Sequence, residues 1–267
     1  MDTWDLMQNW YLVLPPSRPS ALQLARIQSL LAKVDRSLPV AVLGSTPEFR
    51  DLLHESGFQQ IYVLERNPSF YKAMTAARIY RNPENLVNGD WLQSLPTLKE
   101  KFAVILSDLT SGNVPYDQRA QFYEGIEYAL MDSGLFIDKV LTHTGSNLSV
   151  DGLVDKYSTL PLNLIHINNF SSEMLFCSEL IDLRQLVDSS LFYGIVEHRA
   201  KNERVRAFAE EAKRITPPGC IWWYGRKWEE LQRNYCRSLT RISVAEDEPS
   251  SPYYGHLKFF EFTKGDG

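Results

Sequence analysis

Cysteine is scarce in this 267-residue chain, and its spacing indicates no metal or redox site. The three cysteines, Cys177, Cys220 and Cys236, are odd in number and widely separated. Zinc and redox motifs need cysteines only a few residues apart. We therefore expect no bound metal, and reduced thiols of the kind found in cytoplasmic proteins.

An excess of positive charge is also absent. The chain has 28 Lys and Arg against 33 Asp and Glu, which gives a net charge of −5. Proteins that bind nucleic acids or anionic membranes usually present a basic patch, so we expect neither partner. No apolar run is long enough to span a membrane, and the segment Met1–Asp5 lacks the basic region of a signal peptide. These absences favour a cytoplasmic location.

Signature motifs of several large enzyme classes are missing too. The sequence contains no P-loop, no His-Glu-x-x-His and no Gly-x-Ser-x-Gly. It does contain ample core-forming material, since 44% of its residues are hydrophobic. A chain of this length and composition is typical of one large α/β domain, or of such a domain with an inserted subdomain.

One stretch predicts the start of a buried sheet. The apolar run Val40–Leu43 is too short for a helix and is followed by Gly44, which permits a tight turn. Thr46 is predicted to cap the next helix, with Pro47 in its first position. Gly57 is placed to end that helix. The stretch therefore predicts a strand, a loop and a helix.

A second apolar run, Ile61–Leu64, completes this unit and ends at the acidic residue Glu65. Open α/β sheets that bind an adenosine ribose have a glycine turn after the first strand and an acid after the second. The pair of Gly44 and Glu65 therefore predicts a site for an adenosine-containing cofactor.

Later apolar runs extend the sheet. Short strands are predicted at 86–87, 102–107 and 134–140, with helices between them, and a late pair at 239–244 and 256–263. Strands that alternate with helices indicate a parallel sheet covered on both faces. The predicted fold class is α/β: a doubly wound, seven-stranded, mostly parallel, Rossmann-like sheet with a helical insertion before the last strand pair.

This pattern divides the chain into four parts. They are an N-terminal helical and aromatic cap at 1–38, a cofactor-binding core at 39–144, a helical insertion at 145–225, and closing strands at 226–267. Helices in the later parts are predicted at 150–157, 173–187, 198–215 and 227–235. His54 and His198 are predicted to lie on helix surfaces.

Five short motifs follow or precede the predicted strands in order. They are Leu43–Glu48, Glu65, Asn88–Trp91, Ser107–Asp108 and Met131–Leu135. In this order they resemble the motifs of class I S-adenosylmethionine-dependent methyltransferases. The resemblance covers 39–140 well and 226–263 loosely. The family usually has several glycines in the first motif, whereas this chain has one and resembles a less common branch with a Gly-x-Thr-Pro-Glu loop.

The resemblance implies an enzyme that uses S-adenosylmethionine and moves its methyl group to an O or N atom. It implies that Glu65 binds the ribose hydroxyls, that Asp90 binds the adenine amine, and that Asp108 lies near the sulfonium. The residues implied to contact the cofactor are Gly44, Ser45, Thr46, Glu65, Arg66, Asp90, Trp91 and Asp108.

The residues that handle the methyl acceptor are less defined by the sequence. Candidates to deprotonate, orient or cover the acceptor are His143 after the fifth strand, Tyr116 after the fourth, and Tyr11 before the sheet. Aromatic residues of the insertion are expected to line an apolar acceptor pocket or a homodimer contact. We expect a small molecule or a short peptide as acceptor, as in secondary metabolism.

Two other functions stay open on the sequence alone. A nicotinamide-dependent oxidoreductase has a related fold, but pyrophosphate binding favours Gly-x-Gly-x-x-Gly, and Glu48 in the first helical turn would repel phosphates. A non-catalytic partner protein with a methyltransferase fold is the other alternative, because the first motif is incomplete.

Overall fold

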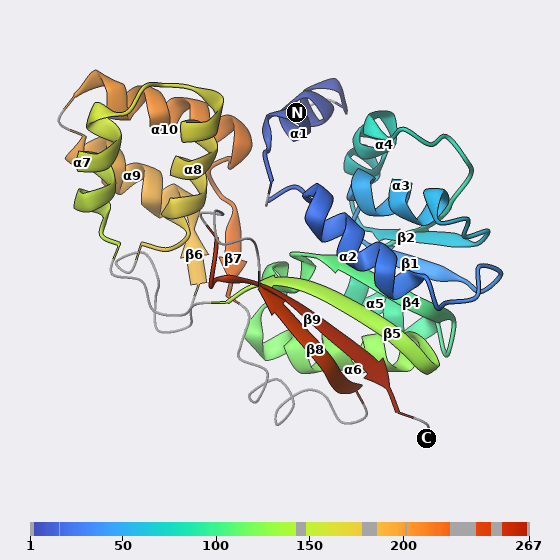
Figure 1. Ribbon diagram of the computed structural model, residues 1–267. Helices are drawn as coiled ribbons and strands as arrows, with labels where there is room; N and C mark the ends of the chain where they lie inside the picture. The colour runs from blue at the N-terminus through green and yellow to red at the C-terminus, as the bar shows by residue number, and fades with distance from the viewer. Residues whose placement is uncertain are drawn as a thin grey trace.

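The computed structural model describes residues 3–15, 17–142, 148–177, 186–200, 202–224, 239–246 and 253–265. Its centre is a seven-stranded sheet (Figure 1). The strands of this sheet are β1 (Val40–Leu43), β2 (Ile61–Glu65), β3 (Asn85–Asn88), β4 (Phe102–Asp108), β5 (Leu130–Leu141), β8 (Leu239–Glu246) and β9 (Leu257–Lys264).

The strand order in this sheet is β3-β2-β1-β4-β5-β9-β8. Strands β1 to β5 are parallel to one another, and β9 is antiparallel to both β5 and β8. The predicted seven-stranded, mostly parallel sheet is therefore confirmed. Because the chain crosses from the β1–β2–β3 half to β4 on the other side of β1, a switch point lies between β1 and β4, where such sheets bind ligands.

Helices cover both faces of the sheet. On one face lie α2 (Ala21–Leu31), α3 (Pro47–Glu55) and α4 (Pro68–Ala77), and on the other lie α5 (Trp91–Ser94) and α6 (Arg119–Ala129) (Figure 1). Ile27, Val42 and Leu53 belong to the core of the first face, whereas Ile105 and Phe122 belong to that of the second. Alternate residues of each strand thus enter opposite cores, as a doubly covered sheet requires.

The local signals between β1 and β2 act as predicted, with one exception. Gly44 has a φ of +83° and Gly57 a φ of +86°, a left-handed conformation that favours glycine. Pro47 opens α3, but the Thr46 side chain makes no cap hydrogen bond. The predicted capping role of Thr46 is wrong, because its hydroxyl instead bonds to Asp108 across the cleft.

A separate helical unit follows the parallel strands. It contains α7 (Val150–Thr159), α8 (Leu164–Met174), α9 (Ser189–Arg199) and α10 (Glu203–Ile215), and two short strands, β6 (Leu186–Asp188) and β7 (Ile221–Trp223), pair at its base. Figure 1 shows β9 pointing away from this unit, so the carboxyl ends of the parallel strands point toward it.

The helical unit has its own core of aromatic and aliphatic side chains, including Tyr157, Phe170 and Phe208. The helix predicted over 173–187 is wrong. Helix α8 ends at Met174, and Leu186 and Val187 belong to β6 because they pair with β7. The helix predicted at 227–235 lies outside the described residues.

The N-terminal segment bridges the two parts of the molecule. Helix α1 (Thr3–Leu12) packs against α4, and the chain then crosses toward the helical unit (Figure 1). The amide of Leu14 donates to Asn168 Oδ1 of α8 at 2.8 Å, and Ser17 shares a 2.7 Å hydrogen bond with Tyr253. Ser20 then begins α2 with a capping box to Gln23.

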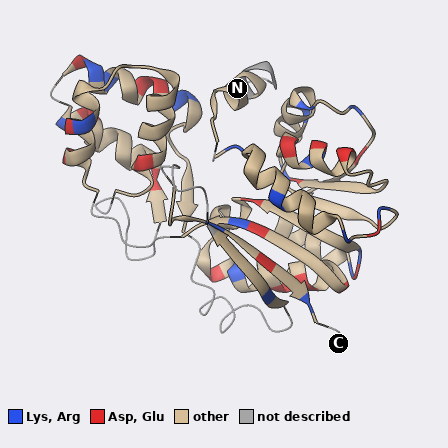
Figure 2. Ribbon diagram, in the orientation of Figure 1, with Lys and Arg blue, Asp and Glu red and all other residues tan. Residues whose placement is uncertain are grey.

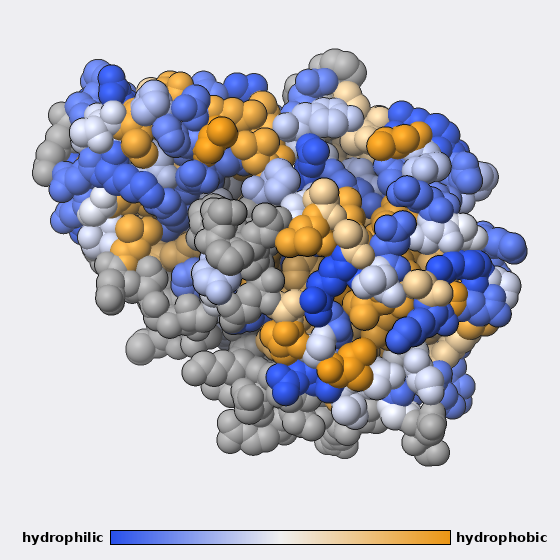
Figure 3. Space-filling model, viewed as in Figure 1, coloured by the Kyte–Doolittle hydropathy of each residue, from blue (hydrophilic) through white to orange (hydrophobic). Residues whose placement is uncertain are grey.

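The surface carries both signs of charge, interspersed over the helical unit and the sheet domain (Figure 2). On the side drawn in Figure 3, hydrophobic patches are separated by polar side chains. Within the described residues, no helix combines the length and apolar character needed to cross a bilayer. The same ranges contain no group of three or more His, Cys, Asp and Glu placed to hold a metal.

Candidate functional site

A cleft of about 430 Å³ opens at the carboxyl ends of β1, β2 and β4. The loops after these strands form its floor, and Trp10 and Ser17 of the N-terminal segment line its side. Seven of the predicted cofactor residues line this cleft: Gly44, Ser45, Thr46, Glu65, Arg66, Trp91 and Asp108. Asp90 does not line it.

Glu65 is the buried acid of the cleft, with 6% of its surface exposed. Its Oε2 accepts a 3.1 Å hydrogen bond from Ser45 Oγ, and its Oε1 accepts a 2.8 Å bond from the amide of Asn67. These two bonds fix the carboxylate at the tip of β2. Because a carboxylate has about four acceptor positions, both oxygens retain capacity for hydroxyl donors from a ligand.

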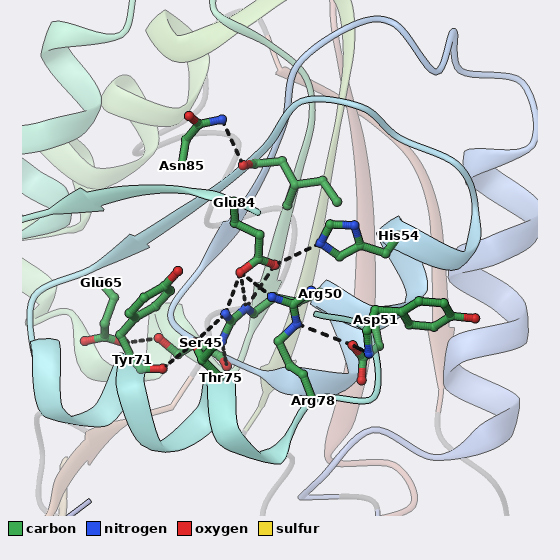
Figure 4. Close-up of polar contacts among 12 residues, drawn as sticks. Ser45, Arg50, Asp51, His54, Glu65, Tyr71, Thr75, Arg78, Glu84 and Asn85 are labelled. Carbon is green, nitrogen blue, oxygen red and sulfur yellow. Dashed lines mark hydrogen bonds and ion pairs between the residues drawn. The ribbon is translucent and has the colours of Figure 1, made fainter. Parts of the chain in front are cut away.

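A buried ionic cluster supports the floor of the cleft from behind (Figure 4). Arg50 of α3 is fully buried and donates Nη1 to the carbonyl of Ser45 at 3.3 Å. Its Nε and Nη2 donate to Glu84 at 3.1 and 2.5 Å, and Nη2 also donates to Thr75 of α4. One guanidinium therefore joins the loop after β1, helix α4 and the segment before β3.

Two more side chains of this cluster surround Glu84. Arg78 Nη1 lies 2.7 Å from the carboxylate and its Nε lies 3.4 Å from Asp51, while His54 Nε2 lies 3.4 Å from Glu84. The prediction that His54 lies on a helix surface is wrong, because its side chain is only 4% exposed. Burial lowers the pKa of His54, and the positive charge of Arg78 adds to this effect.

Asp108 lies across the cleft from Glu65 and is held on both oxygens. Thr46 Oγ1 donates to Oδ2 at 2.9 Å, and Lys139 Nζ lies 2.8 Å from Oδ1. Lys139 also donates to the carbonyl of Ser17 at 3.2 Å, and its side chain is fully buried. Lys139 was not among the site residues predicted from the sequence. The one available signal was the charged pair Asp138 and Lys139 inside a predicted, mostly apolar strand.

Glu48 faces the N-terminal segment rather than the open cleft. Trp10 Nε1 donates to Glu48 Oε1 at 3.2 Å, and Arg18 Nε lies 2.9 Å from the same oxygen. Burial raises the pKa of Glu48, and Arg18 partly opposes this shift. Since Arg18 balances its charge, the repulsion of phosphates that the sequence attributes to Glu48 is weakened.

The loop after β3 places its residues at the opposite end of the cleft. Trp91 Nε1 donates to the carbonyl of Leu64 at 2.8 Å, which fastens the indole beside β2. Asp90 Oδ1 accepts from the amide of Leu92 at 2.9 Å and so caps α5. Arg66 approaches Asp90 to 3.8 Å, and both side chains are exposed. Asp90 and Arg66 line an adjoining cavity of about 510 Å³.

The predicted acceptor-handling residues do not meet in this cleft. The Tyr11 hydroxyl donates to the carbonyl of Ala77 at 3.4 Å, and the ring is 48% exposed. The Tyr116 hydroxyl donates to the carbonyl of Tyr224. His143 lies outside the described residues. Trp10, the neighbour of Tyr11, lines the cleft instead.

Arg119 anchors β7, the short strand that contains Trp222 and Trp223. Its guanidinium is fully buried, donates to the carbonyls of Trp223 at 3.0 Å and Tyr224 at 3.1 Å, and lies over the ring of Tyr116. Trp222, which precedes Trp223 in β7, lines the cleft at the ends of β1, β2 and β4. Arg119 therefore fixes the wall where the helical unit meets the sheet.

Asp138 lies under the loop after β4 and is fully buried. It accepts hydrogen bonds from Ser107 at 2.7 Å, Tyr123 at 3.1 Å and Ser111 at 3.4 Å. Burial raises the pKa of Asp138 to about 6, against the opposing effects of these hydroxyls and of Arg119. The loop after β4 is therefore held in place by a hydrogen bond from Ser111 to the buried Asp138 carboxyl group.

A smaller cavity of about 180 Å³ lies beside the cleft, between the sheet and the helical unit. Ser17, Leu109, Asn113 and Trp222 line both spaces. The cleft and the cavity are therefore adjacent at the end where Asp108 and Lys139 lie.

Comparisons with known proteins identify the fold. No protein-family model matches the chain, and no curated protein matches it in sequence. A SAM-dependent methyltransferase from Anabaena variabilis superposes with a TM-score of 0.55 at 16% identity, covering 99% of this chain and 94% of that one. A S-adenosylmethionine-dependent methyltransferase from Mesorhizobium loti gives 0.53 at 13% identity, covering 93% and 100%.

A third similar structure carries a different assignment. It is a Rhodobacter sphaeroides protein provisionally assigned as a Zn-dependent alcohol dehydrogenase, with a TM-score of 0.58 at 13% identity and full coverage of both chains. Likeness at this identity concerns the fold alone. Together with the strand order, these matches confirm the predicted α/β fold, a Rossmann-like sheet that this chain shares with the two methyltransferases.

Proposed function

We propose that the protein is an S-adenosylmethionine-dependent methyltransferase. The observation that carries this proposal is the cleft at the switch point, which joins the left-handed Gly44, the buried Glu65 and the paired Asp108. An acid fixed at the tip of β2 suits the two hydroxyls of a ribose, because charge-assisted hydrogen bonds are strong in a buried site.

The residues of the cleft fit this cofactor. Gly44 would bring the backbone close to its methionine part, Glu65 would accept from its ribose, and Trp91 with the adjoining Asp90 would contact its adenine. When bound, S-adenosylmethionine supplies a methyl group that its sulfonium has already activated. The chain then has to bind, orient and exclude water, which are effects of proximity.

The same cleft is a poor fit for a dinucleotide. Only one glycine stands in the loop after β1, so fewer backbone amides can approach a pyrophosphate. The nicotinamide alternative therefore lacks a structural observation of its own, since the alcohol dehydrogenase similarity concerns the fold.

We further propose a small molecule as the methyl acceptor, methylated on an O or N atom, as in secondary metabolism. The cavity between the sheet and the helical unit supports this choice, because its lining is mostly apolar and it adjoins the cleft.

Isothermal titration calorimetry with S-adenosylhomocysteine tests the proposal. We expect micromolar binding to the wild type, and Glu65→Ala to weaken it at least tenfold because a carboxylate acceptor is lost. Glu124→Ala, a matched change on the exposed side of α6, should leave binding unchanged. Binding of NADH without binding of S-adenosylhomocysteine would contradict the proposal. Binding of neither would favour a non-catalytic partner protein.

A further inference from the structure

The smaller cavity beside the cleft has a lining that selects by charge and size. Its walls come from four places: the N-terminal segment, the ends of β4 and β5, the helical unit, and the segment before β9. The apolar residues that line it are Val13, Leu109, Leu141, Leu175, Val187, Ile215, Trp222 and Trp223. Among the described residues that line this cavity, none is charged at neutral pH.

The polar side chains in the lining are tied to the protein itself. Asn168 accepts from Leu14 and donates to the carbonyls of Leu12 and Leu164. Ser171 and Thr216 share a 2.6 Å hydrogen bond. These hydrogen bonds hold the lining residues in place. The hydroxyl groups can still accept weak hydrogen bonds from a ligand, but they carry no charge that could balance the charge of an ion.

A similar arrangement holds the side of the cavity near the cofactor cleft. The Tyr253 hydroxyl donates to Ser172 at 2.5 Å and shares a 2.7 Å hydrogen bond with Ser17. An ion that entered the cavity would lose its hydration without gaining a partner, a cost of several kcal/mol or more. The lining therefore favours an uncharged occupant.

The size of the cavity limits the occupant further. At about 180 Å³ it is slightly larger than an apolar cavity of about 150 Å³ that is known to hold benzene. It therefore accommodates a group of about one ring, and it is too small for the side chains and backbone of a peptide. Asn113, which lines both spaces, offers an amide where the ring would meet the cofactor cleft.

We infer that this cavity holds the methyl acceptor, and that the part it holds is an uncharged, apolar group of about one ring. This inference rests on the proposed methyltransferase function and names the acceptor class for that site. The occupant carries its O or N atom at the rim shared by Ser17, Leu109, Asn113 and Trp222, where the cavity adjoins the cleft.

Three probes of one shape test the charge preference: benzamide, which is neutral, benzoate, which is anionic, and benzylamine, which is cationic at pH 7. Their affinities are measured by ligand-observed NMR titration of the full chain saturated with S-adenosylhomocysteine. We expect benzamide to bind at least tenfold more tightly than either ion. Equal binding of the three probes, or tighter binding of an ion, overturns the inference.

Blocking variants test the location. Leu175→Trp fills the cavity from the helical unit, and Val13→Phe fills it from the N-terminal segment, so the location can be tested even where one of them folds poorly. Each should weaken benzamide binding at least tenfold. Leu162→Trp, at an exposed position outside the cavity, is the matched control and should leave it unchanged.

Binding of S-adenosylhomocysteine to the same variants separates the two proposals. It should stay within threefold of wild type in all of them, because none of these positions lines the cofactor cleft. If wild-type protein fails to bind S-adenosylhomocysteine, the proposed function fails. If it binds, but both blocking variants bind benzamide as wild type does, the assignment of this cavity fails alone.

Discussion

The buried pair of Lys139 and Asp108 gives a stability prediction whose size follows from its geometry. Their charged atoms lie 2.8 Å apart, and the side chains are 0% and 4% exposed. Two unit charges at this distance attract by about 6 kcal/mol at an effective dielectric constant of ~20, and desolvation opposes much of that gain. Lys139→Met removes one charge but leaves the buried carboxylate, which costs about 3–5 kcal/mol.

Urea denaturation followed by far-UV circular dichroism measures this loss. We expect the free energy of unfolding of Lys139→Met to fall by about 3–5 kcal/mol. Lys99→Met is the matched control, because Lys99 is 64% exposed and lies 3.9 Å from Glu100. An exposed pair of this kind contributes at most about 1 kcal/mol.

A double-mutant cycle separates the ion pair from general packing. Asp108→Asn in the Lys139→Met background removes the uncompensated charge, so the double variant should be more stable than Lys139→Met alone. A loss below about 1 kcal/mol for Lys139→Met, or no recovery in the double variant, would refute the buried pair.

Three more predictions follow from the site. Burial gives Asp138 a pKa of about 6 against 3.8 in an unfolded chain, so its contribution to stability is full below pH 4 and is lost as the pH rises through 6. As the pH falls from 7 to 4, the free energy of unfolding of the wild type should therefore rise by about 2–3 kcal/mol relative to that of Asp138→Asn, measured by urea titrations at each pH. If the difference between the two proteins is the same at both pH values, Asp138 does not titrate in this range. Arg50→Met breaks the cluster behind Ser45, so it should lower the free energy of unfolding by about 3–5 kcal/mol and weaken the binding of S-adenosylhomocysteine in calorimetry. Arg214→Met, at a position that is 57% exposed, should change neither quantity. Gly44→Ala places a residue with a side chain at a φ of +83°, so it should lower the free energy of unfolding by about 1–2 kcal/mol in a thermal melt. Gly194→Ala, at a position in α9 with open space around it, should leave the stability unchanged or raise it.

The strands of the core could be predicted because their signals are local. Val40–Leu43 and Ile61–Leu64 are short apolar runs between residues that favour turns, and the observed strands Val40–Leu43 and Ile61–Glu65 have nearly the predicted bounds. The residues Gly44, Glu65 and Asp108 could be placed in one cleft for the same reason, since each lies at the end of a strand. The parallel sheet then brings strand ends together without any further information.

The rest depends on contacts between distant segments. Lys139 and Arg50 look like ordinary charged residues until Asp108 and Glu84 are placed against them. Leu186–Asp188 forms a strand because Ile221–Trp223 pairs with it. The sequence of 173–187 alone does not predict that pairing. Threonine is a favoured residue at the start of a helix, but the hydroxyl of Thr46 donates to the Asp108 carboxylate and makes no bond to the helix.

A crystal structure of the protein with S-adenosylhomocysteine tests the central claim most directly. The account predicts density in the cleft at the ends of β1, β2 and β4, with both ribose hydroxyls within hydrogen-bond distance of Glu65 and the amino-acid end beside Gly44. An empty cleft at saturating ligand, or a ligand bound elsewhere with Glu65 uncontacted, would contradict it.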